Sequence, residues 1–255
     1  GLNFPSAVAA VATRIADAAA GRLVMEAGSR RIGSEAAVAA ARAAFIGGID
    51  VSSNLEAGRR YAIPTAGTAA HAFSLAFPSE REAFEAQLAA LGADSTYLVD
   101  THDIDTAIRT AVDVTGGRLR AIRIDSGDLF AEAVRARALL DELGASHTQI
   151  RVSGDLDEYR IADLATAPVD AYESGHRLVT GSGVPSAGFV YKLVAIAEGD
   201  QPGAPLRPVQ TDAEGKQSYG GQKAAWRRLD SRGTATEELV VMRSDRYAEP
   251  MSESD

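Results

Sequence analysis

The stretch Ala121-Ile122-Arg123-Ile124-Asp125-Ser126-Gly127-Asp128 decides the fold. Its β-branched run predicts a strand, Asp125–Asp128 predicts a tight loop, and the amphipathic residues 129–143 predict a helix. The same plan recurs at Ile150-Arg151-Val152-Ser153-Gly154-Asp155, and a third small-polar turn, Thr180-Gly181-Ser182-Gly183, follows another apolar run. Free backbone N–H groups at such loops suit phosphate, and the carboxylates suit ribose hydroxyls or hydrated Mg²⁺. The three turns together predict a site for a phosphorylated, sugar-bearing, metal-associated ligand.

Short apolar runs alternate with longer helical patterns over residues 1–198, which predicts βαβ units and a parallel sheet. With about seven such units, the number approaches that of a barrel. We therefore expect an α/β fold, a parallel β/α barrel or an open parallel sheet, with a small C-terminal extension. Two of its strands are expected at residues 62–66 and 189–197. The polar turns follow strands, and such positions converge on the carboxyl-end face, where active sites lie.

A change in composition near residue 198 predicts the domain boundary. Residues 1–198 are expected to form the barrel domain with the active site. Residues 199–255 are Gly/Pro-rich and then extended, and they are expected to form a β-like extension or lid with a frayed end at 252–255.

Composition narrows the class of protein. Of the 255 residues 45% are hydrophobic, and the formal net charge of −9 argues against nucleic-acid binding. The sequence has no cysteine, which excludes a disulfide or thiol nucleophile within it. No apolar run approaches the length of a membrane span, and no signal peptide is recognisable. The expectation is a cytoplasmic protein without nucleic-acid or membrane partners.

Two side chains stand out as candidates for chemistry. His71 lies just past an expected strand end; a structural histidine is the plainer interpretation, but its place on the site face favours function. No two histidines have metal-ligand spacing, so a zinc site is not expected. Arg123 interrupts an apolar strand, which is costly unless it faces a ligand or a carboxylate. A buried ion pair with Asp125 or Asp100 and a clamp for a carboxylate ligand both remain open.

Asp125 and Asp155 also have a plain interpretation. An Asp just before a helix most often caps it. Capping does not explain the Ser-Gly beside each of them, so a role in the site is expected as well.

Nine motifs that occur in order resemble those of the nicotinate phosphoribosyltransferases, and the resemblance covers the chain to about residue 240. The alanine- and arginine-rich style is similar to that of actinobacterial members. The resemblance implies the irregular barrel of the type II phosphoribosyltransferases. The motifs are Phe4 in Leu2-Asn3-Phe4, Glu26–Arg31, Ser53-Asn54, Gly67–Phe73, Val99-Asp100-Thr101, Arg123–Asp128, Ser153–Tyr159, Arg177–Gly183 and Tyr191–Val194.

The resemblance implies a glycosyltransferase or ligase-class enzyme of NAD biosynthesis. Its reaction joins nicotinate to 5-phosphoribosyl-1-pyrophosphate and gives nicotinate mononucleotide and pyrophosphate. It implies Mg²⁺ with the diphosphate donor, and ATP hydrolysis coupled through a phosphohistidine. It also implies a homodimer with shared active sites, and it leaves the metal ligands unassigned.

Matching residue by residue gives the expected site. His71 matches the phosphorylated histidine and, with Asp125, is assigned to catalysis. Phe4 matches the aromatic that stacks on the pyridine ring, Thr68 and Arg123 match the nicotinate contacts, and Arg30 lies close by. The residues expected to bind the phosphoribosyl pyrophosphate are Ser126, Gly154, Asp155, Thr180, Gly181, Ser182 and Gly183.

Three departures from the family pattern qualify this expectation. The family carries an N-terminal segment, with a tyrosine that stacks on nicotinate from the adjoining subunit, before the point where this sequence begins. The C-terminus is short. Tyr172-Glu173-Ser174-Gly175-His176 replaces a Gly-Val-Gly-Thr type run, and Glu173 weakens phosphate binding unless its carboxylate points away.

These departures leave an alternative function. In it, the chain is a non-catalytic barrel or part of a split enzyme, which binds phosphoribosyl ligands and needs a partner segment for activity. Nicotinamide and quinolinate are near alternatives to nicotinate. Quinolinate would need a second cationic clamp for its second carboxylate.

Overall fold

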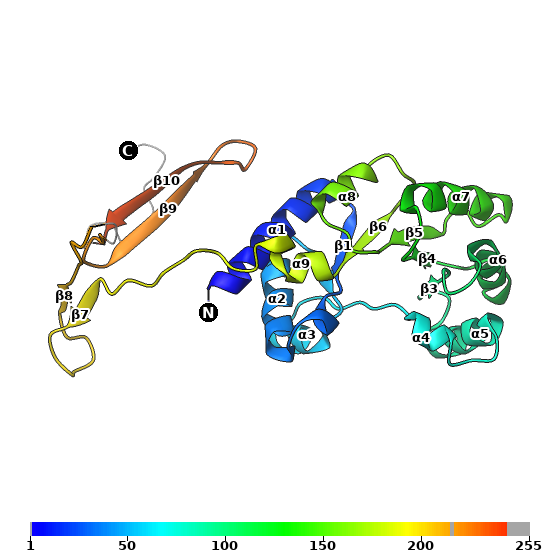
Figure 1. Ribbon diagram of the computed structural model, residues 1–255, viewed down its shortest axis with the longest axis horizontal. Coiled ribbons are helices and arrows are strands. Elements are labelled where there is room, and N and C mark those ends of the chain that lie inside the picture. The colour runs from blue at the N-terminus through cyan, green and yellow to red at the C-terminus, as the bar shows by residue number, and fades with distance from the viewer. Residues whose placement is uncertain (1, 215–216, 244–255) are drawn as a thin grey trace. The chain divides into compact units, whose positions relative to one another are not determined.

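The computed structural model describes residues 2–214 and 217–243 (Figure 1). It divides into two units, Gly1–Gly188 and Phe189–Asp255. The division falls after residue 188, whereas the change in composition placed it after residue 198. The expected frayed end at 252–255 lies outside the described residues.

The first unit is built on a six-stranded parallel sheet of order β2-β1-β6-β5-β4-β3. Because β1 pairs with both β2 and β6, the strands follow one another as in a β/α barrel that is open between β2 and β3. This confirms the predicted α/β fold. The strand predicted at 62–66 is reduced to a single bridge between Ser52 and Thr65. The strands are β1 (Leu23–Glu26), β2 (Val51–Ser52), β3 (Thr96–Leu98), β4 (Ala121–Ile124), β5 (Gln149–Val152) and β6 (Ala171–Ser174).

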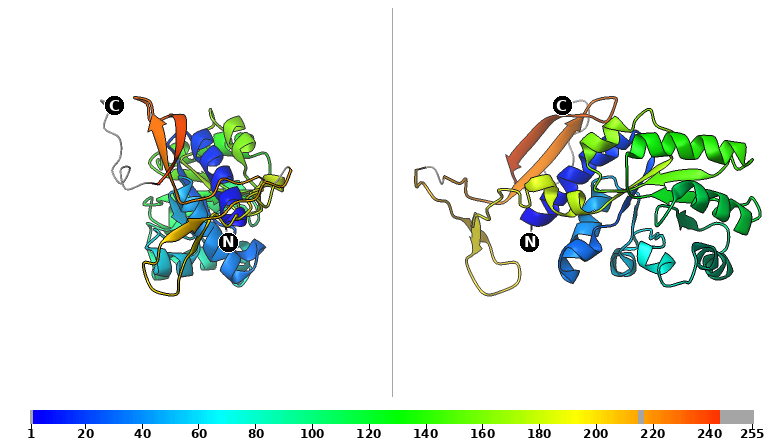
Figure 2. Two further views of the ribbon diagram at one scale, coloured as in Figure 1. Left: turned by 90° about the vertical axis from the view of Figure 1, so that its left-hand side faces the viewer. Right: turned by 45° about the vertical axis from the view of Figure 1, so that its right-hand side comes forward.

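Helices connect these strands and flank the sheet (Figures 1 and 2). Several of them begin at a polar residue whose side chain accepts a hydrogen bond from a backbone N–H of the first turn, as Asn54, Ser79 and Asp103 do. The helical segments are α1 (Asn3–Ala19), η1 (Ser29–Arg31), α2 (Ser34–Ile46), α3 (Leu55–Tyr61), α4 (His71–Ser74), α5 (Glu80–Leu91), α6 (Ile104–Val114), α7 (Leu129–Glu142), α8 (Glu158–Asp163), α9 (His176–Val179) and η2 (Gly181–Gly183).

Successive side chains of β4 alternate between the hydrophobic core and the inner face of the sheet. Ile122 and Ile124 are fully buried in one cluster with Ile108 of α6 and Leu140 of α7. Arg123 lies between them in the sequence and points to the opposite face, because successive strand residues alternate sides. The apolar run of β4 thus anchors the strand, and its one charged residue faces the inside of the open barrel.

The second unit contains two antiparallel pairs, β7 (Ala195–Ala197) with β8 (Leu206–Pro208), and β9 (Lys223–Leu229) with β10 (Ala235–Met242). This corrects the strand predicted over 189–197. Only Ala195–Ala197 is a strand, and it pairs with its neighbour β8 outside the six-stranded sheet. The apolar side chains from Phe189 to Leu193, which suggested a buried strand, are exposed. Among the described residues, the buried hydrophobic side chains all belong to the first unit.

Candidate active site

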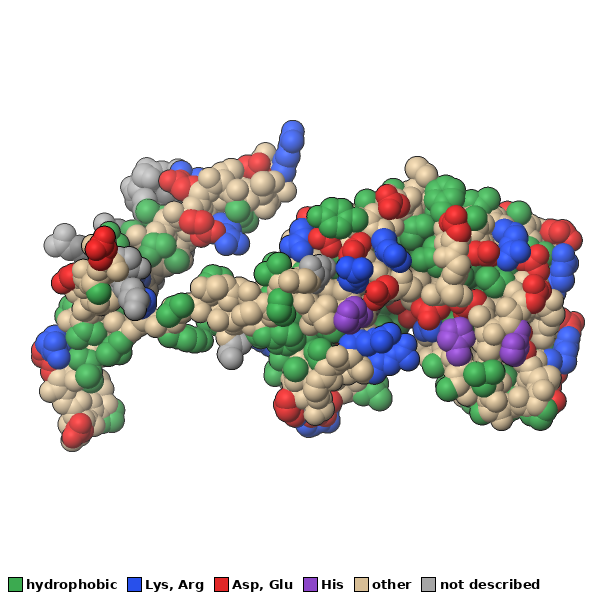
Figure 3. All heavy atoms as spheres, in the orientation of Figure 1, with side chains coloured by type: hydrophobic (Ala, Val, Ile, Leu, Met, Phe, Trp, Pro, Cys, Tyr) green, Lys and Arg blue, Asp and Glu red, His purple; other side chains and the backbone are tan. Residues whose placement is uncertain are grey.

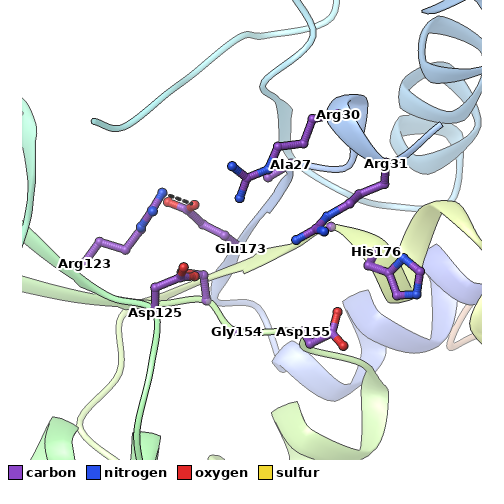
Figure 4. Close-up of a pocket in the computed structure, with 11 residues that line it drawn as sticks. Ala27, Arg30, Arg31, Arg123, Asp125, Gly154, Asp155, Glu173 and His176 are labelled. Atoms are coloured by element: carbon purple, nitrogen blue, oxygen red, sulfur yellow. Dashed lines mark hydrogen bonds and ion pairs between the residues drawn. The ribbon is translucent and has the colours of Figure 1, made fainter. Parts of the chain in front are cut away.

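A cavity of about 380 Å³ lies at the carboxyl ends of β1, β4, β5 and β6 (Figure 4). Its size is that of a small-molecule site. The position is the one expected for the active site of a parallel β/α fold. The residues that line it are Ala27, Arg30, Arg31, Arg123, Asp125, Ser153, Gly154, Asp155, Glu173, Gly175 and His176.

Asp125 and Asp155 line this cavity and do not cap the helices that follow them. Asp128 caps α7 by accepting from the backbone N–H groups of residues 130 and 131, and Asp157 caps α8 in the same way. The plain interpretation of Asp125 and Asp155 as caps is therefore wrong. Their carboxylates are available to a ligand in the cavity.

Gly154 brings the loops after β4 and β5 into close contact. Its φ is +114°, and a Cβ at this position would lie 2.8 Å from the backbone oxygen of Asp125. Only glycine combines that backbone conformation with that approach. The glycine thus sets the spacing between the two cavity carboxylates, Asp125 and Asp155.

Arg123 has partners that the sequence analysis did not assign. Its Nη1 donates to the Thr68 hydroxyl and, at 3.1 Å, to Oε2 of Glu173. The ion pair of Arg123 with Glu173 thus corrects the expected pairing with Asp125 or Asp100. The contact with Thr68 brings together two of the residues matched to nicotinate binding. Burial raises the pKa of Glu173 above its usual value, and the positive charges of Arg123 and Arg151 oppose part of that rise.

His71 begins α4 and faces two carboxylates. Its Nδ1 lies 3.2 Å from the Thr101 hydroxyl, and its Nε2 lies 3.7 Å from Oδ2 of Asp125 and 3.8 Å from Oδ1 of Asp100. The imidazole is 40% exposed, so it remains accessible to a ligand. These contacts place His71 beside the cavity, next to one of its lining residues.

Asp100 holds the start of the loop after β4 in place through two hydrogen bonds. It is almost fully buried, and its Oδ2 accepts from the backbone N–H of Asp125 at 2.9 Å and from the Ser126 hydroxyl at 2.6 Å. From the sequence, Asp100 was expected only as part of a motif and as a possible ion-pair partner of Arg123. Its position directly after β3 was the available signal.

A buried network positions the arginines of η1. Glu26 accepts from the backbone N–H of Gly28 and from the Ser52 hydroxyl, both at 2.5 Å. Burial raises the pKa of Glu26, and these two hydrogen bonds oppose that rise. The network fixes the turn that carries Arg30 and Arg31 into the cavity.

Several expected site residues lie away from the cavity lining. Phe4 packs half-buried against the core from the first turn of α1. The Thr180 hydroxyl donates to the His176 carbonyl, and Gly181 and Gly183 form η2 beside α1. The side chain of Ser182 lies outside the described part of the chain.

The lining also includes residues to which the sequence analysis gave no site role. Their only signal was their place in the motifs: Arg31 and Ser153 lie within two of them, and His176 directly precedes a third. Figure 3 shows basic, acidic and histidine side chains gathered across this face of the first unit. Within the described ranges, no cluster of three or more His, Cys, Asp or Glu side chains could hold a metal ion. No helix in those ranges is long and apolar enough to cross a membrane.

The parallel β/α half-barrel with its cavity at the strand ends is a type II phosphoribosyltransferase fold. A solved structure of nicotinate-nucleotide pyrophosphorylase from Pyrococcus furiosus is similar to this chain, with a TM-score of 0.74 and 26% identity over 94% of this chain and 59% of that one. Human nicotinic acid phosphoribosyltransferase, at 24% identity, shares the fold with a TM-score of 0.71 over 97% of this chain and 57% of that one.

Sequence relatives identify the particular enzymes to which the chain is related. It is 51% identical over 246 residues to a nicotinate phosphoribosyltransferase of Mycobacterium tuberculosis, covering 93% of this chain and 53% of the relative. It is 40% identical over 207 residues to that of Bacillus subtilis, covering 77% and 42%. No family model matches. These relatives confirm the resemblance to nicotinate phosphoribosyltransferases, and the mycobacterial match agrees with the actinobacterial style. The chain spans about half the length of the curated relatives it matches.

Proposed function

We propose that this chain carries out phosphoribosyl transfer from 5-phosphoribosyl-1-pyrophosphate to nicotinate, within NAD biosynthesis. The observation that carries the proposal is the cavity at the carboxyl ends of the parallel strands. It gathers three arginines and two aspartates that do not cap a helix. The names of the relatives support the same reaction.

The cavity residues divide by charge into two roles. Arg123, with the Thr68 hydroxyl, binds the ring carboxylate through charge-assisted hydrogen bonds. Arg30 and Arg31 bind the phosphates of the donor. Loss of pyrophosphate leaves positive charge on the ribose, and the Asp125 carboxylate stabilises that charge as it develops.

The carboxylates of the cavity fit Mg²⁺ that arrives with the diphosphate. Mg²⁺ keeps several waters and is held by one or two carboxylates together with substrate phosphates, so a cluster of three protein ligands is not required. Asp125 and Asp155 would hold it, because neither is used as a helix cap. The bound ion would neutralise negative charge on the departing pyrophosphate.

We further propose that ATP hydrolysis is coupled through His71. Its Nε2 attacks the γ-phosphorus of ATP, an N–P bond forms, and the P–O bond to ADP breaks. The Thr101 hydroxyl at Nδ1 supports this role by orienting the ring so that Nε2 presents its lone pair, and the carboxylates of Asp100 and Asp125 stabilise the positive charge that develops on the ring as the N–P bond forms. The active protein is proposed to be a cytoplasmic homodimer.

The test measures donor binding and product formation separately. The purified chain is titrated with 5-phosphoribosyl-1-pyrophosphate and Mg²⁺, and nicotinate mononucleotide is then quantified by mass spectrometry with and without ATP. We expect donor binding and a product yield that ATP increases. Donor binding without product would favour the alternative, a binding part that needs a partner segment. Absence of both would refute the proposed function.

A further inference from the structure

Glu173 places a buried carboxylate in the lining of the cavity, where it faces Arg123 (Figure 4). Its Oε2 lies 3.1 Å from Nη1 of Arg123, and its side chain is 4% exposed. Arg151 pairs in register with Arg123 across β5 and β4, so both side chains point to the inner face of the sheet. The charge of Arg151 also interacts with Glu173.

The contact between Arg123 and Glu173 is incomplete. It uses Nη1 of Arg123 for both Glu173 and Thr68, instead of the two parallel N–H···O bonds of a forked pair. Nε of Arg123 and Oε1 of Glu173 are both buried without a hydrogen-bond partner among the described residues. A buried polar atom without a partner is unfavourable. Arg123 therefore retains capacity for a second anionic partner, and Glu173 competes with that partner.

The charges of the cluster determine how strongly an anion is attracted. Arg123 and Arg151 together exceed the ionised Glu173 by one positive charge. Among the residues that line the cavity, the charges of Arg30, Arg31 and Arg123 are balanced by those of Asp125, Asp155 and Glu173. A ring carboxylate thus enters a lining that is already formally neutral, whereas the binding of an uncharged ring carboxamide depends little on this charge balance.

We propose that Glu173 is a specificity-determining residue: by occupying Arg123 it reduces the cavity's preference for a pyridine carboxylate over the neutral pyridine carboxamide. Arg151 opposes this effect, because its positive charge also attracts the Glu173 carboxylate and so weakens the hold of that carboxylate on Arg123. The inference rests on the proposed function in taking Arg123 as the contact of the ring carboxylate.

The test compares the binding of nicotinate and nicotinamide by isothermal titration calorimetry at low salt. In Glu173→Gln we expect the preference for nicotinate to rise about tenfold or more, through tighter binding of nicotinate, since a charge-assisted contact is worth about one to two powers of ten. In Arg151→Met we expect the preference to fall, because Glu173 then interacts with Arg123 alone. Two variants with opposite expected signs separate this effect from a general loosening of the site.

Glu158→Gln is the matched control. Glu158 is also a buried carboxylate, paired with Arg14 at 2.7 Å, and it does not line the cavity. Its substitution should leave the preference unchanged. Circular dichroism and melting curves establish that each variant is folded, and if Glu173→Gln does not fold, the expected fall in Arg151→Met decides the matter.

An unchanged or reduced preference for nicotinate in folded Glu173→Gln would overturn the proposal, as would an increased preference in Arg151→Met. Failure of both the native chain and Glu173→Gln to bind nicotinate would overturn it too. The proposed function is tested separately, by whether the native chain forms nicotinate mononucleotide. The two conclusions can therefore fail separately.

Discussion

Gly154→Ala tests whether close packing between the loops after β4 and β5 builds the site. The new Cβ would lie 2.8 Å from the backbone oxygen of Asp125, on a residue whose φ is +114°. The backbone strain contributes about 1–3 kcal/mol, and the overlap contributes a similar amount because a backbone atom cannot rotate away. We expect the free energy of unfolding to fall by about 2–5 kcal/mol.

The assay is urea unfolding followed by far-ultraviolet circular dichroism, which reports the helices of the first unit. The single tryptophan, Trp226, lies in β9 of the second unit, so its fluorescence would not report the change. Gly33→Ala is the control: its φ of −64° suits any residue and nothing lies within 4 Å of the new Cβ. We expect a change of about 0.5 kcal/mol or less there. A loss below about 1 kcal/mol in Gly154→Ala would refute the argument, because it would show that the two loops are free to separate.

Three further outcomes are expected. Arg123→Ala should weaken nicotinate binding by about 2–4 kcal/mol and donor binding far less; equal losses in separate titrations would indicate a structural ion pair. His71→Ala should lose both the ATP stimulation and the acid-labile label from γ-labelled ATP; label retained in the variant would place phosphorylation elsewhere. Burial raises the pKa of Glu26 above 4.5, so the stability it contributes is complete below pH 4.5 and is lost as the pH rises through the raised pKa. Glu26→Gln should therefore gain stability relative to the native chain between about pH 4.5 and pH 8 in urea melts, and a constant difference would contradict this.

The sequence predicted the parts of the fold that depend on local pattern. The β-branched run around Arg123 and its Ser-Gly loop indicated a strand, a turn and a helix, and the repetition of that plan indicated a parallel β/α fold. The run at 189–197 misled because hydrophobicity alone does not show whether a partner strand is available. Its residues pair only through Ala195–Ala197, and with a neighbouring segment rather than with the sheet.

The candidate site was predictable only in part, because side-chain partners depend on tertiary geometry. Arg123 was recognised as needing a carboxylate, but Glu173, 50 residues away in the sequence, supplies it instead of the adjacent Asp125. Capping was assigned to the wrong aspartates, because each loop contains two and the sequence does not show at which of them the helix begins. Asp128 is the cap in the first of these loops.

The cyclic order of the strands has a consequence for the synthesis of this chain. Strands β3, β4 and β5 pair with sequence neighbours, so their contacts can form as each βα unit is completed. β1 gains β6 as its partner only when residues 171–174 have been made. Until then one edge of β1 is unpaired, and such edges promote association between incomplete chains. The late pairing of β1 with β6 makes closure of the sheet a long-range event, and we expect it to limit the rate at which the first unit folds.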